Sequence, residues 1–168
     1  RRCLLRLSDE GVMQRKHGHG WQFLPTLNSP QTRFESYRLR MLLEPAGLLE
    51  PTFRINREQL RRCRERQLEL LEGQVDGQRF IECNAEFHEL LAAASGNGYI
   101  LQAIQQQNRL RRLTEFHTVS NVERVKVSCQ EHLAILDALE QGDNEWAATL
   151  LHRHLEVASK LRVARNKG

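Results

Sequence analysis

Three histidines in the second half of the chain could bind one metal ion. His88, His132 and His154 lie in three separate segments whose apolar residues recur with helical spacing. Rotating each segment by about 100° per residue places each histidine on the apolar side of its helix. Imidazoles that converge from facing helices can hold zinc, nickel, copper or iron in a bundle. Since a lone inward histidine is more often a hydrogen-bonded core residue, the spacing leaves both a metal site and a polar core open.

An amide shares the inward face of the first histidine. Asn84 lies four residues before His88, and this spacing lets both side chains reach one ion from one helix face. In the last helical segment His154 aligns with Trp146, whereas His152 lies on the opposite side. The candidate metal ligands are therefore the three inward histidines and this asparagine.

Two other classes of protein would also fit inward histidines. A metal-dependent hydrolase on a helical bundle needs a general base, but Glu86, Glu89 and Glu131 all rotate away from the predicted centre. That alternative therefore lacks support. A purely structural dimerisation module is the third possibility, and it predicts that His88→Leu is harmless or stabilising.

Polar residues continue the apolar stripe of the segment near residues 97–117. Asn108, Arg111 and Arg112 project on the same side as the apolar residues before them. Arg40 in an earlier helical segment is a comparable candidate. An arginine that lines a pocket can bind a carboxylate through two parallel hydrogen bonds, whereas one at the end of a bundle reaches water. These four residues are the candidate ligands for a small organic acid.

The segments that carry these residues predict an all-α body. Asn56 and Gln59 form a capping box, and Asp143 should cap the last helix. Pro45 should kink or restart the first helix, and Gly96 should end the third in the left-handed conformation. Short joints between long helices favour antiparallel neighbours, so we expect a six-helix antiparallel bundle over residues 33–168. The expected helices are near residues 32–44, 56–73, 78–95, 97–117, 121–142 and 143–165.

The first 25 residues differ from the rest in pattern and charge. "LLRL" indicates the end of a helix, and "RKHGHG" indicates a tight hairpin because Gly18 and Gly20 allow the positive φ that such a turn needs. Most of the net charge of +4 falls in this segment. Such clustering suits contact with nucleic acid or another anionic surface. The polar stretch 26–32 that follows predicts a linker.

Composition bounds the class of protein. The 168 residues are 40% hydrophobic with only 10 Gly and 4 Pro, as expected of one folded, mostly helical domain. No apolar run approaches the about 18 residues of a membrane span, and no signal-peptide pattern opens the chain, which predicts a cytoplasmic protein without a membrane partner. The scattered Cys3, Cys63, Cys83 and Cys129 are expected to be reduced thiols.

The whole pattern resembles the GntR superfamily of bacterial transcription regulators, in the branch whose sensor is the all-helical FCD domain. The resemblance implies the C-terminal part of a winged helix-turn-helix head in residues 1–25, a linker in 26–32, and a sensor that dimerises and binds a small carboxylate. Six helices after the linker look like the shorter, VanR-like version of this sensor. The matching segments are "LLRLSDEGVMQRKHGHGWQFLP", "RMLLEP", "NAEFHELLAAASGN", "EHLAILDALEQGD" and "LLHRHL".

The resemblance also implies a metal. In this family an Asp and three His on the sensor helices bind a divalent ion, often zinc or nickel, and the three histidines correspond to His88, His132 and His154. Asn84 stands where the family usually has Asp, and a neutral amide is a weaker ligand that removes one negative charge. A metal site and a metal-free pocket therefore both stay open.

The resemblance assigns the basic head to operator DNA. The earlier part of the winged head, which would carry most base-reading residues, is expected upstream of this sequence. The residues expected to contact DNA phosphates are Arg1, Arg2, Arg15 and Lys16.

Overall fold

The computed structural model contains a helical bundle preceded by a small head. It has no helix long and apolar enough to cross a membrane within the described residues. The side chains of residues 113–115 and 161–164 and all of Arg1 lie outside the description. The described residues are 2–9, 11–18, 20–24, 26–27, 29–73, 77–115 and 122–164.

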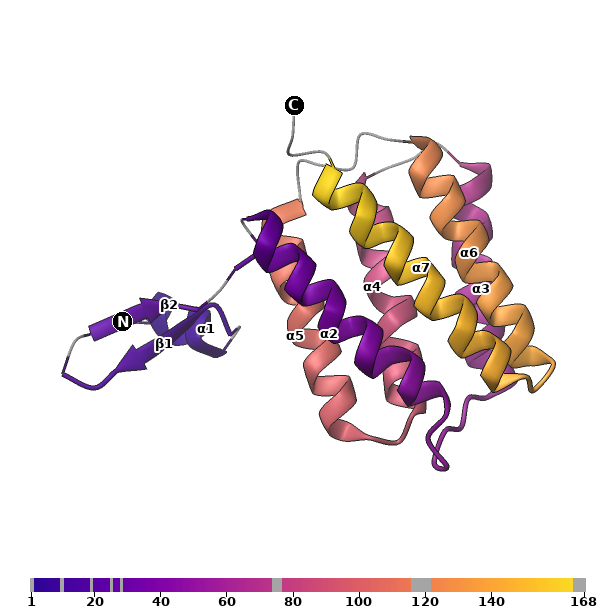
Figure 1. Ribbon diagram of the computed structural model, residues 1–168, viewed down its shortest axis with the longest axis horizontal. Helices are drawn as coiled ribbons and strands as arrows, with labels where there is room; N and C mark the ends of the chain where they lie inside the picture. The colour runs from indigo at the N-terminus through magenta and orange to yellow at the C-terminus, as the bar shows by residue number, and fades with distance from the viewer. Residues whose placement is uncertain are drawn as a thin grey trace.

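The head consists of one short helix and a hairpin. Helix α1 (Arg2–Asp9) precedes strands β1 (Met13–Lys16) and β2 (Gly20–Phe23), which pair antiparallel (Figure 1). Gly18 and Gly20 have φ of 75° and 80°, as the predicted turn requires. The predicted helix end and hairpin are confirmed.

Six helices follow, and the predicted all-α bundle is confirmed. They pack as two layers, with α2, α7 and α6 in front of α5, α4 and α3 in Figure 1. Helix α7 contacts both α2 and α6, while α4 contacts α5, α3 and α2, so α7 and α4 are the central helices of the two layers. The helices are α2 (Pro30–Leu48), α3 (Arg57–Glu72), α4 (Gly77–Ala94), α5 (Gly98–Glu115), α6 (Val122–Glu140) and α7 (Asn144–Ala164).

Helix α2 is longer than predicted at both ends. The helix begins at Pro30, inside the predicted linker, because Ser29 and Thr32 form a capping box and proline suits the first turn. It also continues through Pro45 to Leu48, so the predicted restart of the helix at this proline is wrong. Glu44 and Leu48 are 3% and 0% exposed, so packing on both sides of the proline holds the helix together.

Local end signals elsewhere are confirmed. Asn56 and Gln59 form the predicted capping box of α3. Gly96 adopts φ of 72° just after α4, in the left-handed region expected of a helix-ending glycine. The side chain of Asp143 accepts a hydrogen bond from the Trp146 N–H and so caps α7.

The main apolar core fills the space between the layers. Phe87, Ile135 and Leu151 are each 0% exposed and belong to this cluster. The inward face of α7 includes Leu151 and Leu155, but Trp146 is 52% exposed, so the prediction that aligned His154 with Trp146 is wrong for the tryptophan. Since α7 packs between two helices, its buried face is centred away from that residue.

Candidate metal centre

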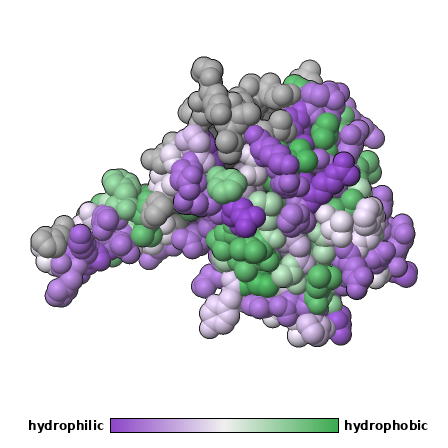
Figure 2. Space-filling view, in the orientation of Figure 1, coloured by the Kyte–Doolittle hydropathy of each residue, from purple (hydrophilic) through white to green (hydrophobic). Residues whose placement is uncertain are grey.

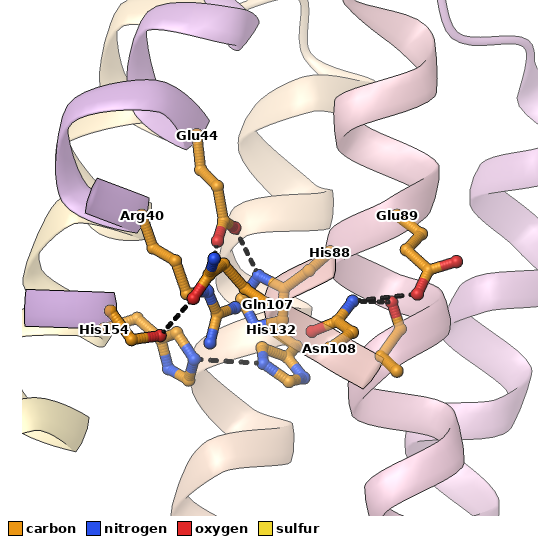
Figure 3. A network of polar contacts seen from close by, with 10 residues as sticks. Arg40, Glu44, His88, Glu89, Gln107, Asn108, His132 and His154 are labelled. Carbon is orange, nitrogen blue, oxygen red and sulfur yellow. Dashed lines mark hydrogen bonds and ion pairs between the residues drawn. The ribbon is translucent and has the colours of Figure 1, made fainter. Parts of the chain in front are cut away.

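The structure brings the three inward histidines together. His88 from α4, His132 from α6 and His154 from α7 are 1%, 0% and 4% exposed. One ring nitrogen of each lies within 4.8 Å of those of the other two (Figure 3). The ring centroids of His132 and His154 are 4.6 Å apart, and that of His88 is 5.4 Å and 5.5 Å from them. His152, in contrast, is exposed as predicted.

Each histidine is held through its Nδ1 atom by an oxygen. His88 Nδ1 lies 2.5 Å from Oε2 of Glu44, and His154 Nδ1 lies 2.7 Å from Oε2 of Glu131. His132 Nδ1 lies 3.0 Å from the amide oxygen of Gln67. Carboxylate and amide oxygens accept hydrogen bonds, so we infer that each Nδ1 carries the proton. Metal-binding histidines are typically oriented in this way, with the other nitrogen left for the ion.

The Nε2 side of the cluster lacks hydrogen-bond donors. His132 Nε2 and His154 Nε2 lie 3.3 Å apart, and the buried His88 Nε2 has no hydrogen-bond partner among the described residues. With the protons on Nδ1, these nitrogens present lone pairs to one another. A cation between them would turn this unfavourable arrangement into a favourable one.

The surroundings keep the three rings neutral. Burial, reinforced by the positive charge of Arg40, holds the pKa of His88 well below its usual value. Burial and the neighbouring His154 do the same to the pKa of His132. Burial also lowers the pKa of His154, and the hydrogen bond that its ring donates to Glu131 opposes part of this effect. Neutral imidazole is the form that binds metal ions.

Asn84 is buried on the same helix as His88. It is 4% exposed and lies one helical turn before His88 on the buried face of α4. Three neutral imidazoles with an amide oxygen form a nitrogen and oxygen donor set that fits a divalent transition metal.

Arg40 and Glu44 form a buried ion pair beside this cluster. Arg40 Nε donates to Glu44 Oε1 at 2.6 Å, and both side chains are 1% exposed. Burial raises the pKa of Glu44, and the neighbouring Arg40 opposes this. The Nη1 and Nη2 atoms of Arg40 have no hydrogen-bond partner within the described part of the chain. Arg40 therefore faces the centre of the bundle, not water.

Two of the three candidate effector ligands on α5 are buried, and the third is exposed. Asn108 is 2% exposed, and its Nδ2 donates to the Ala85 carbonyl at 3.2 Å and to Glu89 Oε1 at 3.0 Å. Its Oδ1 has no partner among the described residues and turns toward the histidine rings in Figure 3. Arg111 is 7% exposed. Arg112 is exposed, so its prediction as a pocket residue is wrong, because the buried face of α5 has turned away by that position.

Sequence reasoning missed three residues that orient the histidines. Glu44, Gln67 and Glu131 were given no role, and Glu131 was predicted to rotate away from the centre. The side chain of Glu131 starts at the edge of the buried face of α6 and is 26% exposed. It reaches His154 on α7 and also accepts a hydrogen bond from Arg124. The spacing of Arg40 and Glu44 was the one available signal, since residues four apart on a helix can form an ion pair.

None of the carboxylates near the site is placed as a general base. Glu44 and Glu131 lie on the Nδ1 side of their histidines, away from the converging Nε2 atoms. Glu86 is exposed and pairs with Arg66, and Glu89 bonds to Asn108. The arrangement suits ligand binding better than activation of water.

The head presents basic side chains to solvent. Arg2, Arg15 and Lys16 are exposed, and Arg1 lies outside the described residues. The burial of Val12 and Met13, each 6% exposed, anchors the first strand beneath them.

Comparisons with known proteins identify the family. The FCD domain model matches residues 35–157, which is most of the chain. This chain belongs to the FCD family. Members of this family are sensor domains of GntR-type transcription regulators and not enzymes, so the implied regulator class is confirmed. No curated protein sequence matches the chain at a significant level.

Solved structures share the fold at low sequence identity. A Listeria monocytogenes protein, Lar, described as controlling expression of the agr system, matches with a TM-score of 0.84 and 12% identity over 99% of this chain and 79% of its own. E. coli McbR/YncC matches with a TM-score of 0.74 and 17% identity over 98% of this chain and 83% of its own. A GntR regulator from Rhodococcus sp. RHA1 matches with a TM-score of 0.70 and 19% identity over 97% and 78%.

Proposed function

We propose that this regulator senses a small carboxylate through a divalent metal, zinc or nickel, held by His88, His132 and His154. The observation that carries the proposal is the geometry of the three rings. Their Nδ1 atoms are fixed by oxygens, and their neutral Nε2 atoms converge without donors. Asn84 would be the fourth protein ligand.

The metal would supply an anchor for the effector. Bound to three imidazoles and an amide, a divalent ion retains positive charge and can accept a carboxylate oxygen as a further ligand. The chain's own residues would orient that carboxylate. Arg40, Asn108 and Arg111 surround the position with buried polar groups. Effector binding then orders the α2, α4 and α5 faces that meet there.

The head would bind operator DNA in the cytoplasm. In this proposal residues 1–25 are the C-terminal part of the winged helix-turn-helix, and the sensor begins with α2 at Pro30. The phosphate contacts would come from Arg1, Arg2, Arg15 and Lys16. Because a dimer must match the spacing of two half-sites, a change in the orientation of two heads would change operator affinity.

One contact could couple the sensor to the head. Gly11 has φ of 71° and lies against the side chain of Gln106 on α5, where an added Cβ would be 3.1 Å from Nε2 of the glutamine. Gln106 is two residues from Asn108, so movement of α5 on effector binding would reach the turn that enters the hairpin.

A second copy would bind the outer face of α2. Figure 2 shows apolar side chains gathered where α2 crosses the front of the bundle. Leu39, Leu42 and Leu49 on this side are 38%, 64% and 52% exposed. An apolar surface of this kind marks an interaction site, and two-fold dimers use the same patch on both subunits.

Calorimetric titration of metal-free protein with zinc tests the proposal. We expect one ion per chain in the wild type, a loss of at least tenfold in affinity in His132→Ala, and no change in the control His152→Ala, whose ring is exposed. Equal zinc affinity in His132→Ala would contradict the site. Operator affinity, measured with and without candidate acids on the zinc-loaded protein, tests the sensing step.

A further inference from the structure

The fixed charges of the buried site indicate the charge of its effector. Resting on the metal site proposed above, we infer that the effector is a dianion, specifically a dicarboxylate that carries a hydroxyl group. One carboxylate would bind the free edge of Arg40, the other would bind the metal, and the hydroxyl would donate to Asn108.

The charge count begins with Glu44. Its Oε1 accepts from Arg40 and its Oε2 accepts from the Nδ1–H of His88, so both oxygens act as acceptors and the carboxylate is ionised. Its negative charge balances the single positive charge of Arg40. Glu131 is likewise balanced by Arg124 at 3.2 Å. Arg111 adds one positive charge that acts on Glu44 and His88, and the carboxylate of Glu89, which accepts from Asn108, adds one negative charge, so these two cancel in the count.

The divalent ion is then left without a counter-charge from the protein. Asn84, the one further candidate ligand, is neutral, so two positive charges stay uncompensated in a water-excluded site. Buried charge is costly unless it is paired. A monocarboxylate would leave one positive charge in excess, whereas a dicarboxylate would leave none. An aspartate at position 84 would shift the balance toward a monoanion.

The unpaired hydrogen-bonding atoms specify where the two ends of the ligand bind. Arg40 is 1% exposed and its Nε is already occupied by Glu44, which leaves Nη1 and Nη2 as adjacent donors without a partner among the described residues. This fork matches the two oxygens of a carboxylate. The Nε2 atoms of the histidines, where the metal would bind the second carboxylate, lie on the side of the cluster opposite Glu44.

The orientation of Asn108 indicates that the ligand carries a hydroxyl group. Its Nδ2 is fixed by Ala85 and Glu89, so its Oδ1 must face the histidines and cannot be exchanged with the amide nitrogen without losing both bonds. Oδ1 is an acceptor without a donor among the described residues. A hydroxyl on the ligand would provide the missing donor.

Titration of the zinc-loaded protein with L-malate, succinate and butyrate tests the inference. We expect malate to bind about tenfold more tightly than succinate, for one hydrogen bond, and succinate at least about tenfold more tightly than butyrate, which has the same chain length but no second charge. Asn84→Asp should reverse the preference between succinate and butyrate. Arg40→Lys, which keeps the charge but loses the fork, should weaken malate about tenfold. Arg112→Ala is the matched control and should leave malate affinity unchanged.

Different results would contradict the dianionic effector and the metal site. Butyrate binding as tightly as succinate to the zinc-loaded wild type would overturn the dianion while metal-dependent sensing stands. Failure of the protein to bind zinc would overturn both. If Asn84→Asp does not fold, the wild-type series with the three acids decides the question by itself.

Discussion

The bundle contains two buried regions of opposite character. In the apolar core around Ile135, Leu151 and Leu155, each side chain is 0% exposed and packs against others of its kind. In the polar centre, atoms of equal burial lack partners within the described residues, among them His88 Nε2 and Nη1 and Nη2 of Arg40. The first region is completed by the chain itself, whereas in the function proposed above a metal and its effector complete the second.

Phe87 joins the two regions. It is 0% exposed, belongs to the apolar cluster, and stacks on His132 with ring centroids 3.9 Å apart and planes at 17°. Each buried polar atom left unpaired costs about 1–3 kcal/mol. The apolar core therefore stabilises the fold while the polar centre reduces its stability until a ligand binds. The following predictions test this division.

The largest effect is expected from Glu44→Ala. The substitution leaves the buried Arg40 without its partner, so the free energy of unfolding should fall by about 3–5 kcal/mol. Urea denaturation of metal-free protein measures this. The double variant Glu44→Ala with Arg40→Met, which removes both charges, should recover much of the loss. A double variant no more stable than the single one would contradict this explanation.

Leu151→Ala should lower the free energy of unfolding nearly as much, because it removes apolar packing instead of a charged partner. Removing a fully buried leucine leaves a cavity, and the free energy of unfolding should fall by about 2–5 kcal/mol. The loss should be the same with and without zinc, because this residue belongs to the apolar core. A loss that disappears on adding zinc would mean that the two regions are not separate.

Zinc itself should stabilise the wild type through the polar centre. At a free zinc concentration of about 100 times Kd the gain is about 2.7 kcal/mol, measured as a shift in the urea midpoint. His132→Leu should lose this gain, because it removes one of the three proposed metal ligands. His152→Leu should keep the full gain, and an equal gain in His132→Leu would exclude this ring as a ligand.

The smallest effect is expected at the buried thiols. Burial, with a contribution from the neighbouring Cys83, raises the pKa of both Cys63 and Cys129 to about 11. At pH 8 about one molecule in a thousand would carry a thiolate at each of these positions, compared with about one in four for an ordinary thiol. An aromatic disulfide reagent should modify the exposed Cys3 first and these two only on unfolding. Rapid modification of Cys129 in folded protein would show that the apolar region opens readily.

The sequence predicted what periodicity and local signals control. The caps at Asn56 and Asp143 and the turn at Gly96 depend on neighbouring residues, and all three are as predicted. His88 and His132 were placed correctly because both lie within helices whose buried faces are clear. The expected metal and effector roles of these residues stay predictions.

The positions that were missed or wrongly predicted depend on contacts between helices, and a helical projection does not contain such contacts. Glu131 leaves the edge of α6 and turns back onto α7, and Gln67 reaches His132 from α3. Arg112 and Trp146 lie at the margins of buried faces, where a shift of one position changes inward to outward. Pro45 stays helical because its neighbours are packed. In each case tertiary packing decided the outcome.

X-ray absorption spectroscopy of the zinc-loaded protein tests the central claim most directly. We predict about three nitrogen ligands at about 2.0–2.1 Å with the outer scattering of imidazole rings, and one zinc per chain. His154→Ala should lose one of the three rings from the spectrum. Sulfur ligands at about 2.3 Å, or a zinc shell without imidazole, would contradict a metal centre built from His88, His132 and His154.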